Sequence, residues 1–157
     1  MRIYQYNRNN AEKVRHLMES CSNYAPEYVG VHAGEDDLSY IEDSFFQSND
    51  GGKAYIVCDD AGMAVSFITC TVLGQRWYIT GLYVNADRDA EANALASLNL
   101  LASCIQEPGR VCINVNPAAT DIVAFWENNH YVLSPEYSVF TNADNEKISS
   151  YVVSVSN

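Results

Sequence analysis

The sequence lacks any apolar stretch long enough to cross a membrane. No segment approaches the roughly 18 consecutive apolar residues that a spanning helix needs. The first ten residues, MRIYQYNRNN, also lack the apolar core of a secretory signal. With 157 residues and a hydrophobic content of 48%, the chain can bury a sizeable core in one domain. We therefore expect a single soluble, cytoplasmic domain over residues 1–157, with no membrane partner.

Basic residues are scarce. Nine lysines and arginines stand against 20 aspartates and glutamates, which gives a formal net charge of −11. Nucleic acid is a polyanion that proteins bind by neutralising phosphates, so this charge argues against a nucleic-acid partner. The acidity can simply keep the protein soluble, or it can attract amines or a basic partner protein. The sequence leaves both uses open, as it leaves open a monomer or a homodimer.

Closely spaced metal ligands are missing as well. The five cysteines are an odd number without a Cys-x-x-Cys spacing, and the three histidines lie far apart without a second ligand at helical spacing. We expect buried free thiols and no metal site. The cysteines are Cys21, Cys58, Cys70, Cys104 and Cys112, and the histidines are His16, His32 and His130.

Apolar periodicity and turn residues predict an α/β (α+β) domain in which helices and strands are mixed. A first helix should begin after a cap at Asn9 or Asn10 and end near Asn23. The three strands between 53 and 84 should form an antiparallel meander, and the strand at 111–115 should pair in parallel with the third of them across a helix. Strands are expected at 2–6, 53–58, 62–72, 77–84, 111–115, 131–141 and 149–155, and further helices at 36–48, 88–106 and 120–129.

The most informative segment reads YITGLYV and continues through NADRDAEANA into an alanine- and leucine-rich helix. A strand that ends at a helix N-terminus can present free backbone N–H groups and the positive end of the helix dipole to an anion. Its small residues, Ala90, Ala92 and Ala94, are alanines where glycine would give a freer backbone. Alanine keeps its amide N–H and costs nothing sterically where φ is negative. This segment is therefore a candidate phosphate cradle.

The charges of this cradle are unusual. Asp87, Asp89 and Glu91 surround a single cation, Arg88. A carboxylate at Asp89 would repel a nearby phosphate. Alternatively, Asp87 or Asp89 caps the helix and complements its dipole in place of a ligand.

The order of the elements, with YITGLYV and the later segment VNPAATDIVAFWENNHYV, resembles the GCN5-related N-acetyltransferase (GNAT) superfamily over about residues 2–155. The resemblance implies a GNAT fold, with a single mixed central sheet of about seven strands and about four flanking helices. It implies acetyl-CoA as the cofactor, with its pantetheine arm between the splayed fourth and fifth strands. The acceptor would be a small-molecule or peptide amine.

The chain departs from the family pattern at the cofactor turn. The family usually has Arg or Gln, two residues, Gly, one residue, and then Gly or Ala, and the aligned positions are Asp89, Ala92 and Ala94. By this resemblance the cofactor-binding residues are Leu82, Tyr83, Val84, Asp89, Ala90, Glu91, Ala92, Asn93, Ala94, Ala119 and Trp126.

The catalytic groups of the family are also absent from their usual places. The tyrosine that protonates the departing thiolate aligns with Trp126, whose indole is no acid at neutral pH, and a glutamate that can relay a proton aligns with Thr80. An asparagine near the cofactor aligns with Ala119. Substitute candidates near the start of the sixth strand, where the acceptor approaches in this family, are His130, Tyr131 and Tyr137. A lone histidine at a helix C-terminus can equally be a dipole partner.

Two functions therefore remain open. One is an active N-acyltransferase with a degenerate cofactor motif. The other is an inactive binding or regulatory protein that keeps the GNAT scaffold and has a filled groove, with side chains such as Trp126 inside it. Titration with acetyl-CoA separates the two, and short of that the state of the gap between the strands at 77–84 and 111–115 is the most informative observation.

Overall fold

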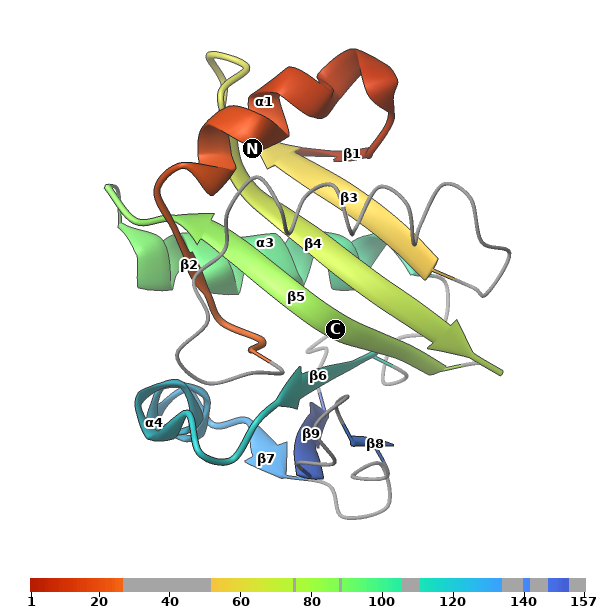
Figure 1. Cartoon of the computed structure of the whole chain (residues 1–157), viewed down its shortest axis with the longest axis vertical. Coiled ribbons are helices and arrows are strands. Elements are labelled where there is room, and N and C mark those ends of the chain that lie inside the picture. Colours follow the sequence, from red (N-terminus) through yellow and green to blue (C-terminus); the bar gives the residue numbers. More distant parts are fainter. Residues whose placement is uncertain are drawn as a thin grey trace.

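The computed structural model describes residues 1–26, 52–74, 76–87, 89–105, 111–133, 140–141 and 147–152. Seven of the described strands follow one another in one sheet, in the order β1-β3-β4-β5-β6-β9-β7, while β2 pairs with β5 and β8 pairs with β9 (Figure 1). The strands are β1 (Arg2–Gln5), β2 (Cys21–Asn23), β3 (Gly52–Cys58), β4 (Ala64–Leu73), β5 (Arg76–Asn85), β6 (Val111–Val115), β7 (Val132–Leu133), β8 (Phe140–Thr141) and β9 (Lys147–Val152). The helices are the short 3-10 helix η1 (Arg8–Asn10), α1 (Ala11–Met18), α3 (Ala90–Cys104) and α4 (Thr120–Asn128).

Two helices pack on opposite faces of the meander formed by β3, β4 and β5 (Figure 1). Successive strand residues point to opposite faces of a sheet, so Phe67 packs with Val14 and Leu17 of α1, while its neighbour Ile68 packs with Leu98 and Leu101 of α3. All five side chains are buried. The sheet is thus covered on both faces, and its edges and strand ends are the places where a ligand could enter.

Most of the strands predicted for the first 115 residues are confirmed. The meander is antiparallel throughout, and β6 pairs in parallel with β5 after the crossover through α3. The helix predicted at 36–48 lies outside the described residues, as do 134–139 and 153–155 of the last predicted strands. The expectation of one domain over residues 1–157 stays a prediction.

The first helix is shorter than predicted. It ends at Met18, and residues 21–23 form the strand β2 instead of a last helical turn. Ser and Asn are poor helix formers, and Pro26 disfavours helical geometry at Ala25. The prediction of a helix reaching Asn23 is therefore wrong.

The N-terminal cap of this helix also differs from the prediction. The side chain of Asn7 accepts a hydrogen bond from the N–H of Asn9 (2.8 Å), and the side chain of Asn10 accepts one from the N–H of Asn7 (2.9 Å). Asn10 makes no side-chain cap bond to α1. The cap therefore belongs to η1 and lies at Asn7, because the chain enters α1 through a 3-10 turn.

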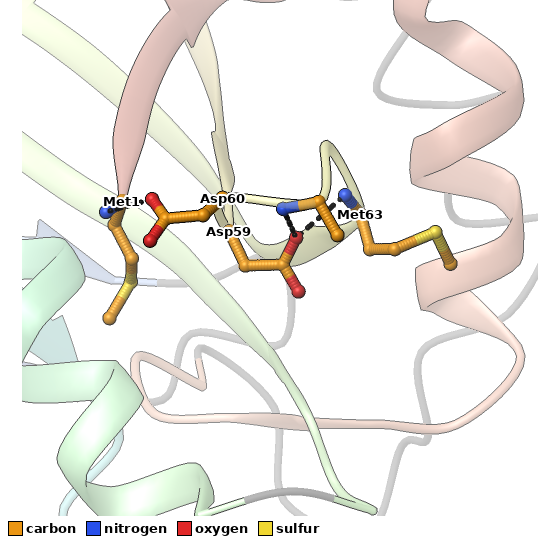
Figure 2. Close-up of polar contacts among 5 residues, drawn as sticks. Met1, Asp59, Asp60 and Met63 are labelled. Carbon is orange, nitrogen blue, oxygen red and sulfur yellow. Dashed lines mark hydrogen bonds and ion pairs between the residues drawn. The ribbon is translucent and has the colours of Figure 1, made fainter.

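The turn between β3 and β4 forms as the sequence predicted (Figure 2). The Oδ1 atom of Asp59 accepts hydrogen bonds from the N–H groups of Ala61 (3.0 Å) and Met63 (2.9 Å), and Gly62 has a φ of 81°. This left-handed conformation suits glycine. The neighbouring Asp60 lies 3.6 Å from the amino group of Met1.

All five cysteines are free thiols, as predicted. Three are buried, but Cys104 is exposed and Cys21 is partly exposed, so the expectation of burial is wrong for these two. Cys104 is the last residue of α3, and Cys21 begins β2. None of the described helices is both long and apolar enough to span a membrane.

Candidate functional site

The neighbours β5 and β6 pair over only part of the length of β5. Three parallel pairs join them, from Trp77 opposite Val111 to Ile79 opposite Ile113. The register of β5 against β4 shifts at the next residue, since Cys70 lies opposite Ile79 while Thr69 lies opposite Gly81. Thr80 is thus the extra residue of a β-bulge, a feature that bends a strand and ends regular pairing. Beyond it β5 diverges from β6.

A side chain at Gly81 would crowd this bulge. A Cβ atom added to Gly81 would lie 2.6 Å from Oγ1 of Thr69 and 2.7 Å from Cε2 of Tyr83, closer than such atoms approach without rearrangement. The hydroxyls of Thr69 and Thr80 lie 3.1 Å apart across the two strands. The bulge is therefore tightly packed and fixes where the gap begins.

The strand β2 occupies the gap. It pairs with β5 in the antiparallel sense, with Cys21 opposite Asn85 and Asn23 opposite Tyr83, and in Figure 1 it runs beside β5 toward α4. The ladder is extended at both ends, because the N–H of Ala86 donates to the carbonyl of Ser20 (3.1 Å) and the N–H of Tyr24 donates to the carbonyl of Leu82 (2.8 Å). The groove implied by the family resemblance is thus filled by this chain's own backbone.

The side chain of Asn23 accepts a hydrogen bond from the N–H of Leu82, which the backbone ladder leaves without an acceptor. Its Oδ1 atom accepts from the N–H of Leu82 (3.1 Å) and from the N–H of Ala25 (2.9 Å). Leu82 and Ala25 are fully buried, and a buried N–H without a partner costs roughly 1–3 kcal/mol. This side chain therefore ties β2 to β5 and also fixes the turn that follows it.

The opposite wall of the groove is α4, and it also bonds to the segment that follows β2. The indole N–H of Trp126 donates to the carbonyl of Tyr24 (2.7 Å), and the ring of Phe125 lies edge-on to the ring of Tyr24 with centroids 4.9 Å apart. At the end of β6, the N–H of Asn116 donates to the carbonyl of Pro26 (2.8 Å). Hydrogen bonds therefore join this segment to β5, α4 and β6.

The bend from strand to helix lies where the sequence predicted it. β5 ends at Asn85 and α3 begins at Ala90, with Asp89 at the N-cap position; Arg88 lies outside the described residues. The side chain of Asp89 makes no cap hydrogen bond, although its carbonyl accepts from the N–H of Asn93 (3.0 Å). The alternative in which the Asp89 carboxylate caps α3 is therefore not seen.

The start of α3 offers the donors that an anion needs. By helix geometry, the N–H groups of Ala90, Glu91 and Ala92 have no partner within the helix. Ala92 and Glu91 are exposed, Ala90 is partly exposed, and Ala94 is buried against the sheet. The helix start thus has backbone donors beside exposed acidic side chains, and its use as a phosphate cradle stays a prediction.

Carboxylates from two helix starts reach the region of Tyr24. The pKa of the Tyr24 phenol is raised, first because the ring is buried and then because Glu91 at the start of α3 and Asp121 at the start of α4 are negative. We define segment 20–26 as these residues with β2 among them; its Tyr24 is close enough to the starts of α3 and α4 for their carboxylates to affect its pKa.

The predicted site residues fall into separate environments. The side chains of Leu82, Val84 and Trp126 are fully buried, so these residues can offer a ligand only backbone groups as they stand. Ala119 is buried at the N-cap of α4, and Tyr83 is partly buried against Phe67. Their assignment to a cofactor site stays a prediction.

The structure places the catalytic candidates in different surroundings. His130 is exposed and adopts a φ of 69° at the end of α4. The ring of Tyr131 packs edge-on against Trp126, with centroids 4.9 Å apart, and burial raises the pKa of its phenol. Tyr137 lies outside the described residues. Within the described part of the chain, no group of three or more His, Cys, Asp or Glu could hold a metal ion.

Sequence reasoning missed the residues that fill the groove. The structure has Cys21, Ser22 and Asn23 in a strand, where the sequence predicts the end of a helix. Pro26 and the low helix propensity of Ser22 and Asn23 could have ended the helix earlier. No local pattern in three polar residues indicates a strand, because its partner is 60 residues away.

Comparison with known proteins gives structural matches but no sequence match. No model of a protein family matches the chain, and no curated protein sequence does. Similar solved structures include the ribosomal-protein-S18-alanine N-acetyltransferase from Escherichia coli, with a TM-score of 0.61 and 10% identity over 99% of this chain and 95% of that chain. An acetyltransferase of the GNAT family from Staphylococcus aureus Mu50 has a TM-score of 0.60 and 15% identity over 97% of this chain and 98% of that chain. Spermidine N-acetyltransferase from Vibrio cholerae, solved in complex with CoA and spermine, has a TM-score of 0.61 and 11% identity over 96% and 93%, respectively.

Proposed function

We propose that this chain, which has the fold of the GCN5-related N-acetyltransferases, is an N-acyltransferase that moves an acetyl or other acyl group from coenzyme A to an amine. A shared fold does not by itself give a function. The observation that carries the proposal is the divergence of β5 from β6 beside the N-terminus of α3. A diverging strand offers an edge to an extended arm, and the helix N-terminus beside it offers donors to phosphates.

The residues that would hold coenzyme A form a helix start and a strand edge. At the helix start, the N–H groups of Ala90, Glu91 and Ala92 fit an anion, while the Asp89 carboxylate opposes it. At the strand edge, Leu82 and its neighbours Tyr83 and Val84 fit an extended arm only when β2 is not paired with them. When bound, the coenzyme would supply the activated acyl group as a thioester.

Proton handling would rest on few groups of the chain. Thr80 cannot act as a base near neutral pH, so the acceptor amine would have to arrive neutral. Tyr131 is the stronger candidate for a proton donor, because its partly buried phenol has a raised pKa and stays protonated at neutral pH. Exposed His130 is the weaker candidate.

The acceptor would be an amine of a small molecule or a peptide. The net charge of −11 favours the approach of a cation. The structure from Vibrio cholerae contains the polyamine spermine, and the one from Escherichia coli is named for an alanine of a ribosomal protein. These neighbours support the class of acceptor for this chain and not its identity.

A second candidate function is an inactive binding or regulatory protein on the same scaffold, with a small-molecule, peptide or basic protein partner. The occupied edge of β5 favours it, because Leu82 uses both its N–H and its carbonyl within the chain. The acidic cradle around Asp89 favours it too.

Titration with acetyl-CoA tests the proposal. Isothermal calorimetry should give saturable binding in the micromolar to millimolar range, and liquid chromatography should detect free CoA when spermine or an alanine-terminated peptide is added. Saturable binding without turnover on any amine would favour the second candidate. The absence of binding at several millimolar acetyl-CoA, to the wild type and to Tyr24→Ala, which loses the ring contact between segment 20–26 and α4, would reject the enzyme.

A further inference from the structure

Segment 20–26 lies on the same backbone edge that an extended coenzyme arm would need. We propose that this segment competes with the pantetheine arm of coenzyme A, so that the coenzyme binds only after the segment has left the groove. This proposal rests on the proposed function. It adds an autoinhibitory contact that is built from the chain itself.

The competition concerns particular backbone groups of β5. In an antiparallel ladder, residues with paired hydrogen bonds alternate with residues that point away. The bonds of Ala86 to Ser20 and of Tyr24 to Leu82 fix this alternation, so the N–H and carbonyl of Leu82 and Val84 face segment 20–26. An arm with its own amide groups would pair with the same edge, as a peptide does when it adds a strand to a sheet.

Segment 20–26 also bonds to α4, which forms the far wall of the groove. The Trp126 indole, at the position where the family resemblance places an acid, donates to the carbonyl of Tyr24. The phenol of Tyr24 lies near Glu91 and Asp121 at the two helix starts. Segment 20–26 therefore bonds to the edge of β5 and to α4 at once, and the carboxylate of Glu91 at the start of α3 is close enough to affect its Tyr24.

The weak burial of β2 suits segment 20–26 to leave the groove. β2 is three residues long, and all three are only partly buried, whereas β6 is buried at every position. The exchange has a cost, because Tyr24 and Ala25 would leave the core. The apparent affinity for coenzyme is then reduced by the fraction of molecules in which the groove is open.

A reversible covalent lock tests the competition. Cys21 lies opposite Asn85 at a position of the ladder without paired hydrogen bonds, where the Cα atoms of antiparallel strands come within about 4.5 Å, the short end of the range a disulfide spans. The variant Asn85→Cys, made in a Cys104→Ser background, should form a Cys21 disulfide when oxidised glutathione takes up the two hydrogens. Peptide mapping without reductant identifies the bond.

The expected result is a loss of acetyl-CoA binding on locking. The dissociation constant, measured by calorimetry, should be at least tenfold weaker for the oxidised protein than for the same protein after reduction. The variant Asn85→Ser with Cys104→Ser, treated with the same oxidant, should show no change. Equal affinity before and after locking would overturn the competition and leave the proposed function standing.

A variant in which segment 20–26 is held less firmly tests the case in which the unlocked protein does not bind acetyl-CoA. Tyr24→Ala removes the ring that packs on Phe125, and a thermal melt shows whether the variant is folded. Binding of acetyl-CoA by folded Tyr24→Ala but not by the wild type would support the competition. If neither binds at several millimolar, the proposed function and the competition are both overturned.

Discussion

The edge of β5 that faces away from β4 pairs with two different segments along its length. From Trp77 to Ile79 it pairs with β6, and from Leu82 to Asn85 it pairs with β2 and the residues around it. β6 reads VCINV and is buried at every position, whereas β2 reads CSN and is partly exposed at each. The first half is held by side-chain burial, and the second half by hydrogen bonds of backbone and amide groups.

This difference separates what builds the fold from what can change within it. Apolar burial contributes about 25 cal/mol per Å² and cannot be replaced by a polar ligand, so β6 belongs to the scaffold. The hydrogen bonds of a strand edge contribute less net free energy to folding than this burial does, and equivalent bonds to a ligand can replace them. The bulge at Thr80 marks the boundary between the two halves.

The largest effect should follow from a substitution in the scaffold half. Ile113→Ala removes a fully buried side chain from β6 and should lower the free energy of unfolding by about 2–5 kcal/mol. Urea unfolding followed by circular dichroism measures this loss. The matched change in β2, Ser22→Ala, should cost less than about 1 kcal/mol, and an equal loss in the two variants would abolish the contrast.

Asn23→Ala should have the next largest effect. It leaves the N–H groups of buried Leu82 and Ala25 without their acceptor, which should cost about 1–3 kcal/mol in the free energy of unfolding. Asn23→Asp keeps an oxygen at this position and is the control. If alanine is tolerated as well as aspartate in urea unfolding, Asn23 does not hold the segment.

A smaller effect on affinity is expected from Asp89→Asn at the start of α3. Removing a carboxylate beside the phosphates should strengthen acetyl-CoA binding about threefold or more at low salt. The gain should shrink as salt rises, because exposed charges are screened. Glu12→Gln, which removes one negative charge on α1, should leave the dissociation constant unchanged, and an unchanged constant for Asp89→Asn would place the phosphates elsewhere.

Thiol labelling should distinguish β6 from β2 by the reactivity of their cysteines. Each of the two strands that pair with this edge of β5 has one cysteine, Cys112 on β6 and Cys21 on β2. Burial raises the pKa of Cys112 to about 11, so its reactive thiolate is scarce at pH 8. Iodoacetamide at pH 8 should modify Cys21 and exposed Cys104 within the time in which Cys112 stays unmodified, as peptide mass spectrometry will show. Equal labelling of Cys112 and Cys21 would mean that the two halves open together.

The scaffold half was predictable from the sequence, and the exchangeable half was not. A strand-length run after a helix, apolar at four of its five positions, indicates a buried parallel strand, and β6 lies where this pattern placed it. The strand-to-helix bend before Ala90 was also predictable, because the turn residues and the start of the helix are local. β2 was not, because its strand geometry depends on pairing with Tyr83 to Asn85. The bond of the Trp126 indole to Tyr24 joins residues far apart in the chain and has no local signal either, and the role of Trp126 at a cofactor site stays a prediction.

Amide hydrogen exchange at Leu82, measured by NMR on the protein without coenzyme, shows whether segment 20–26 occupies the edge of β5. If segment 20–26 fills the groove, the Leu82 amide is bonded to Asn23 and should exchange at least a hundredfold more slowly than the amide of Ala92 in the first turn of α3. Exchange of Leu82 as fast as that of Ala92 would show that the edge of β5 is open, and it would contradict the account.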